Sequence, residues 1–96
     1  ELPVQILTPD SALYEVVENQ TAFLHCHAFG APAPTVEWLN PALEPALQDD
    51  RAFAFTNGTL RLGPAARGDS GGFTCRAHNP HSNGSVTARL SVRGQR

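Results

Sequence analysis

The sequence predicts an all-β fold in which two sheets pack face to face as a sandwich. Short runs of alternating apolar and polar residues recur along the chain, whereas the apolar periodicity of a helix is absent. Eight glycines and eight prolines punctuate these runs and mark turns. Because the chain has 96 residues, we expect a single domain with one hydrophobic core.

Two short strands are expected at the start of the chain. We predict that residues 1–3 form a linker and residues 4–7 the first strand, which ends at Pro9. Alternate positions of residues 12–16 are apolar, which predicts a second strand that pairs with a different partner from the first.

A longer strand is predicted over residues 22–28, and its two faces differ. Because side chains alternate along a strand, the face that carries Cys26 is expected to be the core face. The inward set is Ala22, Leu24, Cys26 and Ala28, and the outward set is Phe23, His25 and His27.

A turn and a further strand follow. Residues 30–34 contain two prolines, which cannot donate to a strand ladder, so we expect a turn there. The next strand should begin at Thr35, with Val36 and Trp38 pointing inward. Residues 40–50 contain two more prolines and leave room for one short strand at most.

The second half of the chain predicts four strands. Residues 51–55 and 59–62 should form a hairpin around Asn57-Gly58, and residues 64–68 should cross to the other sheet. Strands over residues 72–79 and about 86–92 should meet at a hairpin tip at Asn83-Gly84, before an exit linker. The predicted inward residues of the first two of the last three strands are Leu60, Leu62, Phe73, Cys75 and Ala77. Along the last strand, Val86, Ala88, Leu90 and Val92 alternate with the other residues.

Charge and hydropathy exclude several classes of function. The formal net charge is −2, every basic residue is arginine, and no basic stripe is present, so nucleic acid is not an expected partner. No apolar run approaches the roughly 18 residues of a membrane span, and no signal peptide is visible. We therefore expect a module of a longer protein, folded over about residues 4–93, that does not itself span a membrane.

The spacing of three residues resembles a known family. Cys26 is followed by Trp38 and then by Cys75 within D-S-G-G-F-T-C, and residues 30–38 read G-x-P-x-P-x-V-x-W. This pattern resembles the I-type set of immunoglobulin domains, which are two-sheet Greek-key sandwiches. The resemblance implies a Cys26–Cys75 disulfide between the sheets, beside Trp38, that stabilises the fold by about 4 kcal/mol. Two buried free thiols in a cytosolic domain are the alternative.

Arg67-Gly68-Asp69 matches the tripeptide that integrins recognise, and the family resemblance also gives it a structural role. An integrin would bind the aspartate through a metal ion and the arginine through an acidic groove, so the loop would have to protrude. In the family, however, the aspartate at this position commonly pairs with an arginine where Arg51 stands. Breaking a partly buried pair is costly, so the two roles compete. The family also usually has tyrosine at Phe73, where its hydroxyl binds the preceding turn.

Three N-x-S/T sequons indicate an extracellular, glycosylated protein. They begin at Asn19, Asn57 and Asn83, all at predicted turns or strand ends. Together with a disulfide they favour an oxidising compartment. Chance use of turn-forming asparagine is the alternative.

Neither a metal site nor a catalytic site is expected. His25 and His27 could form at most a weak pair of ligands, because His78 should lie on the opposite face and His81 in a loop. No nucleophile, base and acid form a set, so we predict no enzyme activity and no cofactor.

Four segments carry a closer resemblance. Residues 6–9 (I-L-T-P), 29–32 (F-G-A-P), 47–49 (L-Q-D) and 57–60 (N-G-T-L) are similar to an immunoglobulin domain of the neural adhesion family that includes Ng-CAM, NrCAM and neurofascin, in the fifth position. The resemblance implies an extracellular part of a plasma-membrane receptor that acts in cell–cell contact and axon growth. Its partners would be the same receptor on other cells, related immunoglobulin adhesion molecules, and integrins. A purely structural spacer is the alternative.

Overall fold

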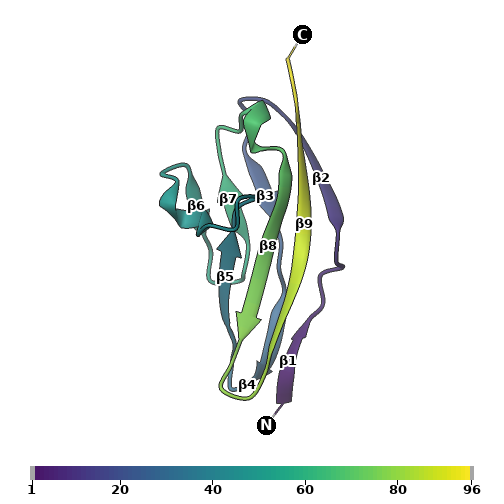
Figure 1. Ribbon diagram of the computed structural model, residues 1–96, viewed down its shortest axis with the longest axis vertical. Helices are drawn as coiled ribbons and strands as arrows, with labels where there is room; N and C mark the ends of the chain where they lie inside the picture. Colours follow the sequence, from purple (N-terminus) through teal and green to yellow (C-terminus); the bar gives the residue numbers. More distant parts are fainter. Residues whose placement is uncertain (1, 96) are drawn as a thin grey trace.

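The computed structural model describes residues 2–95 and contains strands and two 3-10 turns in that range (Figure 1). This confirms the all-β prediction. The molecule is elongated, with extents of 51 × 24 × 21 Å. Its elements are β1 (Leu2–Ile6), β2 (Ala12–Val17), β3 (Ala22–Leu24), β4 (Ala28–Ala31), β5 (Thr35–Leu39), η1 (Ala46–Gln48), β6 (Ala52–Ala54), β7 (Leu60–Leu62), η2 (Arg67–Asp69), β8 (Gly71–His78) and β9 (Asn83–Arg93).

The strands form two layers. One layer is a four-stranded sheet in the order β2-β9-β8-β5, and the other contains the three-stranded sheet β3-β7-β6 and the pair β1-β4. The predicted change of partner at the start of the chain is confirmed, because β1 pairs with β4 whereas β2 runs parallel to β9. Figure 1 shows β1 and the end of β9 at opposite ends of the long axis.

A disulfide and a tryptophan form the centre of the core between the layers. Cys26 is bonded to Cys75, as predicted, and Trp38 lies opposite Cys75 on the neighbouring strand. Trp38 is 3% exposed, and its Nε1 donates to the carbonyl oxygen of Gly58 at 3.0 Å, so its polar atom is satisfied. All residues that were predicted to point inward are buried, except for the half-buried Ala28 and Val36. Of the alternating residues of β9, Val86 is half-buried and the other three are buried.

The strand predicted over residues 22–28 is interrupted. Its alternation of buried and exposed side chains is as expected, but the ladder stops after Leu24 and resumes at Ala28. Between them, the N–H of His25 donates to the hydroxyl of Tyr14 at 3.3 Å, and the N–H of His27 to the Thr8 hydroxyl at 2.8 Å. Side chains of neighbouring segments therefore replace backbone partners at the point where the chain passes from one ladder to the other.

Two predictions for the neighbouring segments were wrong. Leu2 and Pro3 belong to β1 and not to a linker, while Glu1 lies outside the described residues. Gly30 and Ala31 belong to β4 and not to a turn, and Leu2 lies opposite Ala31. Proline has no backbone N–H to donate, but Gly30 and Ala31 do. The strand can therefore continue as far as Ala31, the residue before Pro32. Pro3 is tolerated because β1 is an edge strand.

The predicted hairpin tip at Asn83-Gly84 was also wrong, because both residues lie in β9, opposite His78 and Ala77. The tip is residues 79–82. The buried Asn79 organises it: its Oδ1 accepts from the N–H groups of His81 and Ser82 at 2.9 and 3.0 Å, and its Nδ2 donates to the Pro32 carbonyl at 2.9 Å. The turn is formed by the Asn79 side chain, which binds the backbone of the residues that follow it. The prediction had relied on the Asn83-Gly84 dipeptide alone.

Residues 40–50 form less than a full strand, in agreement with the small room that was expected. Leu39 makes a single bridge to Pro45, and η1 follows immediately. The arrangement covers Leu39, which is 7% exposed beside the core residue Trp38.

Gly58, in the predicted hairpin turn, packs directly against the core at Cys26. The turn lies between β6 and β7, as expected, and Gly58 has a φ of 95°, which favours glycine. A Cβ at this position would stand 2.0 Å from the carbonyl oxygen of Cys26, which is rigid backbone. The residue is therefore fixed by both its conformation and its closeness to the disulfide.

We expect Gly58→Ala to lower the free energy of unfolding by about 2 kcal/mol or more, from the unfavourable φ and the collision with Cys26. Gly68→Ala is the matched control, since no atom lies within 4 Å of a Cβ there, and it should change stability by less than about 0.5 kcal/mol. Urea unfolding measures both. Equal effects of the two substitutions would contradict this account of the turn.

Candidate functional site

The Arg67-Gly68-Asp69 tripeptide forms η2, on the crossover between β7 and β8. Figure 1 shows this turn at the end of the sandwich where β9 finishes. The turn is tied to the loop before β3, because the N–H of Asn19 donates to the Ala65 carbonyl at 2.7 Å and the N–H of Ala65 to the Gln20 carbonyl at 2.8 Å. The tripeptide, Asn19 and the end of β9 therefore lie at the same end of the sandwich.

Asp69 is engaged through both of its carboxylate oxygens. Oδ1 accepts from Nη2 of Arg51 at 2.9 Å, and Oδ2 accepts from Nη1 of Arg51 at 2.8 Å and from the N–H of Ala66 at 2.7 Å. Its side chain is only 15% exposed. The hydrogen bonds from Arg51, and then that from Ala66, hold the pKa of Asp69 below its usual value. The ion pair predicted for Arg51 and Asp69 is thus present and bidentate.

Arg51 also binds Asp49, a partner that the sequence analysis missed. Its Nε and Nη2 donate to the two oxygens of Asp49 at 3.0 and 2.7 Å, and Nη1 also donates to the Pro64 carbonyl at 2.9 Å. The hydrogen bonds from the Arg51 side chain, and then that from its backbone N–H, hold the pKa of Asp49 at about 2. An acidic residue two positions before the arginine was the available signal. All five N–H donors of the guanidinium thus have an acceptor.

The other two residues of the tripeptide are accessible. The side chain of Arg67 is 71% exposed, and its only described ion-pair contact is a long one of 4.0 Å to Glu18. Nothing lies within 4 Å of a Cβ at Gly68. The turn therefore presents an accessible cation next to a carboxylate that is already occupied.

Phe73, which stands where the family usually has tyrosine, is 4% exposed and belongs to the core. With a phenyl ring there is no hydroxyl to bind the crossover. The bonds to Asn19, Gln20 and Arg51 hold the crossover instead.

The asparagines of the three sequons are all exposed. Asn19 lies in the turn before β3 with a φ of 74°, Asn57 lies in the β6–β7 turn, and Asn83 begins β9. Each could carry a glycan without displacing the core.

The histidines are dispersed, as predicted. His25 and His27 are exposed on one layer and His78 on the other, while His81 lies in the 79–82 loop. Nδ1 of His25 lies 3.1 Å from the hydroxyl of Thr59. Within residues 2–95, no three histidine, cysteine, aspartate or glutamate side chains are grouped to hold a metal ion.

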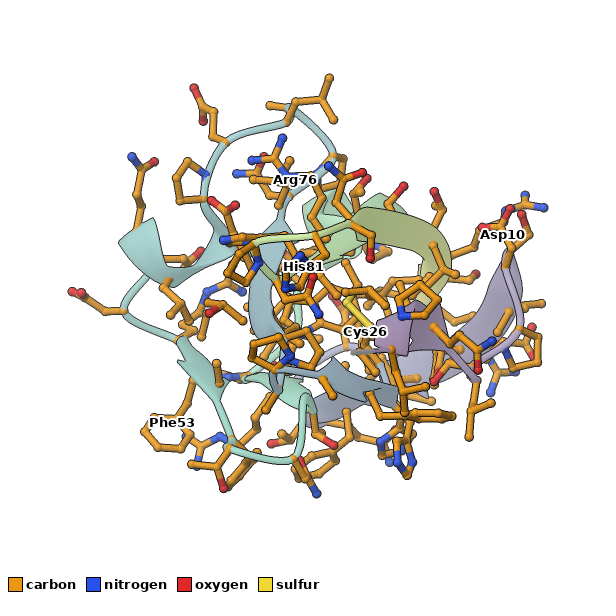
Figure 2. The ribbon with its side chains drawn as sticks, turned by 90° about the horizontal axis from the view of Figure 1, so that it is seen from below. Asp10, Cys26, Phe53, Arg76 and His81 are labelled. Carbon is orange, nitrogen blue, oxygen red and sulfur yellow. A yellow bond between two sulfur atoms is a disulfide. The ribbon has the colours of Figure 1, made fainter. Side chains whose placement is uncertain are left out.

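The two outer faces differ in polarity. The face of β3-β7-β6 carries Phe23, Phe53 and Phe55, which are 47%, 53% and 40% exposed. The outer face of β5 and β8 carries the exposed ion pair between Arg76 and Glu37, at 2.9 Å. Figure 2 shows Phe53 and Arg76 pointing outward on different sides of the disulfide. One face thus carries exposed aromatic rings on either side of Arg61, and the other carries an exposed ion pair.

Fold, disulfide and Trp38 together define an immunoglobulin-type domain, and comparison with known proteins agrees. Residues 3–79 match the family described as "Immunoglobulin domain". The chain therefore belongs to the immunoglobulin domain family. Its fold is shared with the solved immunoglobulin domains 1–5 of Sidekick-1, with a TM-score of 0.84 and 27% identity over 94% of this chain and 19% of that one.

Two curated relatives are neural adhesion molecules. The chain is 67% identical to chicken neuronal-glial cell adhesion molecule over 93 residues and 43% identical to mouse neural cell adhesion molecule L1, each over 97% of this chain. The predicted resemblance to the Ng-CAM group is confirmed at the level of this domain. The chain spans only 7% of the length of these relatives.

A domain of this family is non-enzymatic, so its function must come from binding surfaces and from its shape. No helix within residues 2–95 has the length and apolar character needed to cross a bilayer. The surfaces to consider for binding are therefore the turn at Asp69, the two outer faces and the surroundings of the three sequon asparagines.

The free energy of unfolding should depend on pH through the ion pairs that Arg51 makes with Asp49 and Asp69. The folded-state pKa values of Asp49 and Asp69 lie below the ordinary value of 3.8, so their stabilisation is complete above about pH 4 and is lost towards pH 2. We expect the free energy of unfolding to fall by about 2 kcal/mol over this range, mainly through the less exposed Asp69.

Asp69→Asn should flatten this pH dependence, and Glu37→Gln should not, since the Glu37–Arg76 pair is exposed and worth little. Urea unfolding at a series of pH values measures the difference. An unchanged pH dependence in Asp69→Asn would show that the carboxylate does not contribute in this way.

Proposed function

We propose that this chain is an extracellular cell-adhesion module of a neural adhesion receptor in the plasma membrane. The single observation that supports this most is the 67% identity to neuronal-glial cell adhesion molecule over nearly the whole domain. The partners would be the same receptor on a neighbouring cell and related immunoglobulin adhesion molecules, in contacts that support axon growth. Its position as the fifth immunoglobulin domain of such a receptor remains a prediction.

We also propose that Asn19, Asn57 and Asn83 are glycosylated. They are exposed, and the disulfide supports an oxidising, extracellular setting, where N-glycans are also found. Glycans there would restrict which surfaces a partner can reach. The outer face of β5 and β8 near Asn83 and the turn at Asn19 would be partly covered.

Integrin recognition through Arg67, Gly68 and Asp69 is a second candidate function. The exposed Arg67 and the open space at Gly68 favour it. The carboxylate of Asp69 opposes it, because coordination to an integrin's metal ion would break two hydrogen bonds to Arg51. We therefore assign Asp69 a structural role and treat the tripeptide as a turn of the scaffold.

Cell attachment to the immobilised, glycosylated domain separates these functions. We expect neurons to attach more than to an unrelated immunoglobulin domain, and Arg67→Ala to leave attachment unchanged. Arg89→Ala, which removes an exposed arginine of β9 outside the tripeptide, is the matched control for charge.

Attachment that needs a divalent cation and is lost in Arg67→Ala, but not in Arg89→Ala, would replace our assignment with integrin binding. If no form supports attachment, the adhesion proposal for this domain fails. The domain would then act as a structural spacer between neighbours that bind.

A further inference from the structure

We propose that the innermost sugar of a glycan on Asn57 packs on the exposed ring of Phe55, so that the aromatic outer face beside the β6–β7 turn is covered by the chain's own glycan. This inference rests on the proposed glycosylation of Asn57. It assigns an occupant to the exposed rings of Phe53 and Phe55 on this face.

The β6–β7 turn holds Phe55, Asn57 and Thr59 close together. The carbonyl of Phe55 accepts from the N–H of Gly58 at 3.0 Å, and the N–H of Phe55 donates to the carbonyl of Thr59 at 2.8 Å. The positive φ of Gly58 allows both bonds in so short a loop. Because Phe55 and Thr59 lie opposite each other, their side chains share the outer face.

The side chain of Asn57 is oriented by the same turn. Its Oδ1 accepts from the N–H of Thr59 at 3.0 Å, and among residues 2–95 its Nδ2 makes no hydrogen bond. Nδ2 is the atom to which a sugar is attached. The attachment point is thus fixed next to the face that carries Phe55, without loss of any contact.

Phe55 offers the first sugar a preformed surface. Its ring is 40% exposed and packs edge-on against Phe53, with the ring centroids 5.0 Å apart. The negative face of an aromatic ring attracts weakly positive C–H groups, which line one face of N-acetylglucosamine. A glycan tethered two residues away is also at a high effective concentration. A free partner protein would lack that advantage.

The other two sequons lack this arrangement. The residue two positions before Asn19 is Val17, which has no ring. Asn83 lies within the ladder of β9 rather than in a closed turn. The proposed contact is therefore specific to Asn57.

Thermal unfolding of a chain with one sequon tests the proposal. Thr21→Ala and Ser85→Ala remove the other two sequons at exposed positions and leave Asn57. The chain is secreted from a glycosylating host and trimmed to a single N-acetylglucosamine, and the bare form is exported to a bacterial periplasm so that its disulfide forms. Mass spectrometry of the Asn57 peptide establishes occupancy.

We expect the sugar to raise the melting temperature by about 4 °C with Phe55 present and by less than about 1 °C in Phe55→Ala. Phe55→Leu, which keeps an apolar side chain without a ring, should lose most of the effect. Phe23→Ala is the matched control, because it removes an equally exposed ring on β3 and should leave the effect of the sugar intact. Ring-current shifts of the sugar protons, absent in Phe55→Leu, would report the contact directly.

Two results would overturn the inference. If Asn57 is unmodified in the secreted chain, both this contact and the proposed glycosylation of Asn57 fail, while the adhesion proposal is untouched. If Asn57 is modified but the sugar stabilises the Phe55 and Phe55→Ala forms equally, the contact fails alone, and the rings are then available to a protein partner.

Discussion

The guanidinium of Arg51 is the contact on which one end of this domain depends. Arg51 immediately precedes β6, and its guanidinium binds Asp49, the Pro64 carbonyl on the crossover, and Asp69 in η2. All five of its donors are used, and the planar fork of arginine is the group best suited to two carboxylates at once. One side chain therefore holds the segment before β6 against the crossover that contains Pro64 and Asp69.

The ion pair with Arg51 affects how the Arg67-Gly68-Asp69 motif should be interpreted. Arg-Gly-Asp is a recognition signal only where its carboxylate can leave the protein surface to bind a metal ion. Here the carboxylate accepts three hydrogen bonds, and its side chain is mostly buried. The accessible part of the tripeptide is Arg67, which is not sufficient for that chemistry. The domain's binding function is better sought on its faces, whose polarity differs and whose sequons decide what a partner can reach.

Most of the sandwich could be predicted from the sequence, since alternation identifies the inward residues wherever a strand has one buried face. The position of Cys26 set the phase of its strand, and Leu60, Phe73 and Leu90 followed the same rule. The pairing of Arg51 with Asp69 came from the family resemblance and not from alternation.

The errors lie where a side chain or a distant strand decides the backbone. Asn79 sets the β8–β9 loop through bonds to residues 81 and 82 and to Pro32, which no local dipeptide reveals. Gly30 and Ala31 are in a strand only because β1 lies alongside them. Asp49 was missed because its role depends on the direction in which Arg51 points. Such contacts join residues that are far apart in the sequence, or they depend on side-chain rotamers. The apolar periodicity of the sequence carries no information about either.

The most direct test of the account is a double-mutant cycle between Arg51 and Asp69, with the free energy of unfolding measured for the native chain, Arg51→Ala, Asp69→Ala and the double variant. If Arg51 holds the turn through Asp69, the two substitutions should be non-additive, with a coupling energy of about 2 kcal/mol. A coupling energy near zero would mean that Asp69 is held by other contacts and is free to leave Arg51, and the structural assignment of the tripeptide would be contradicted.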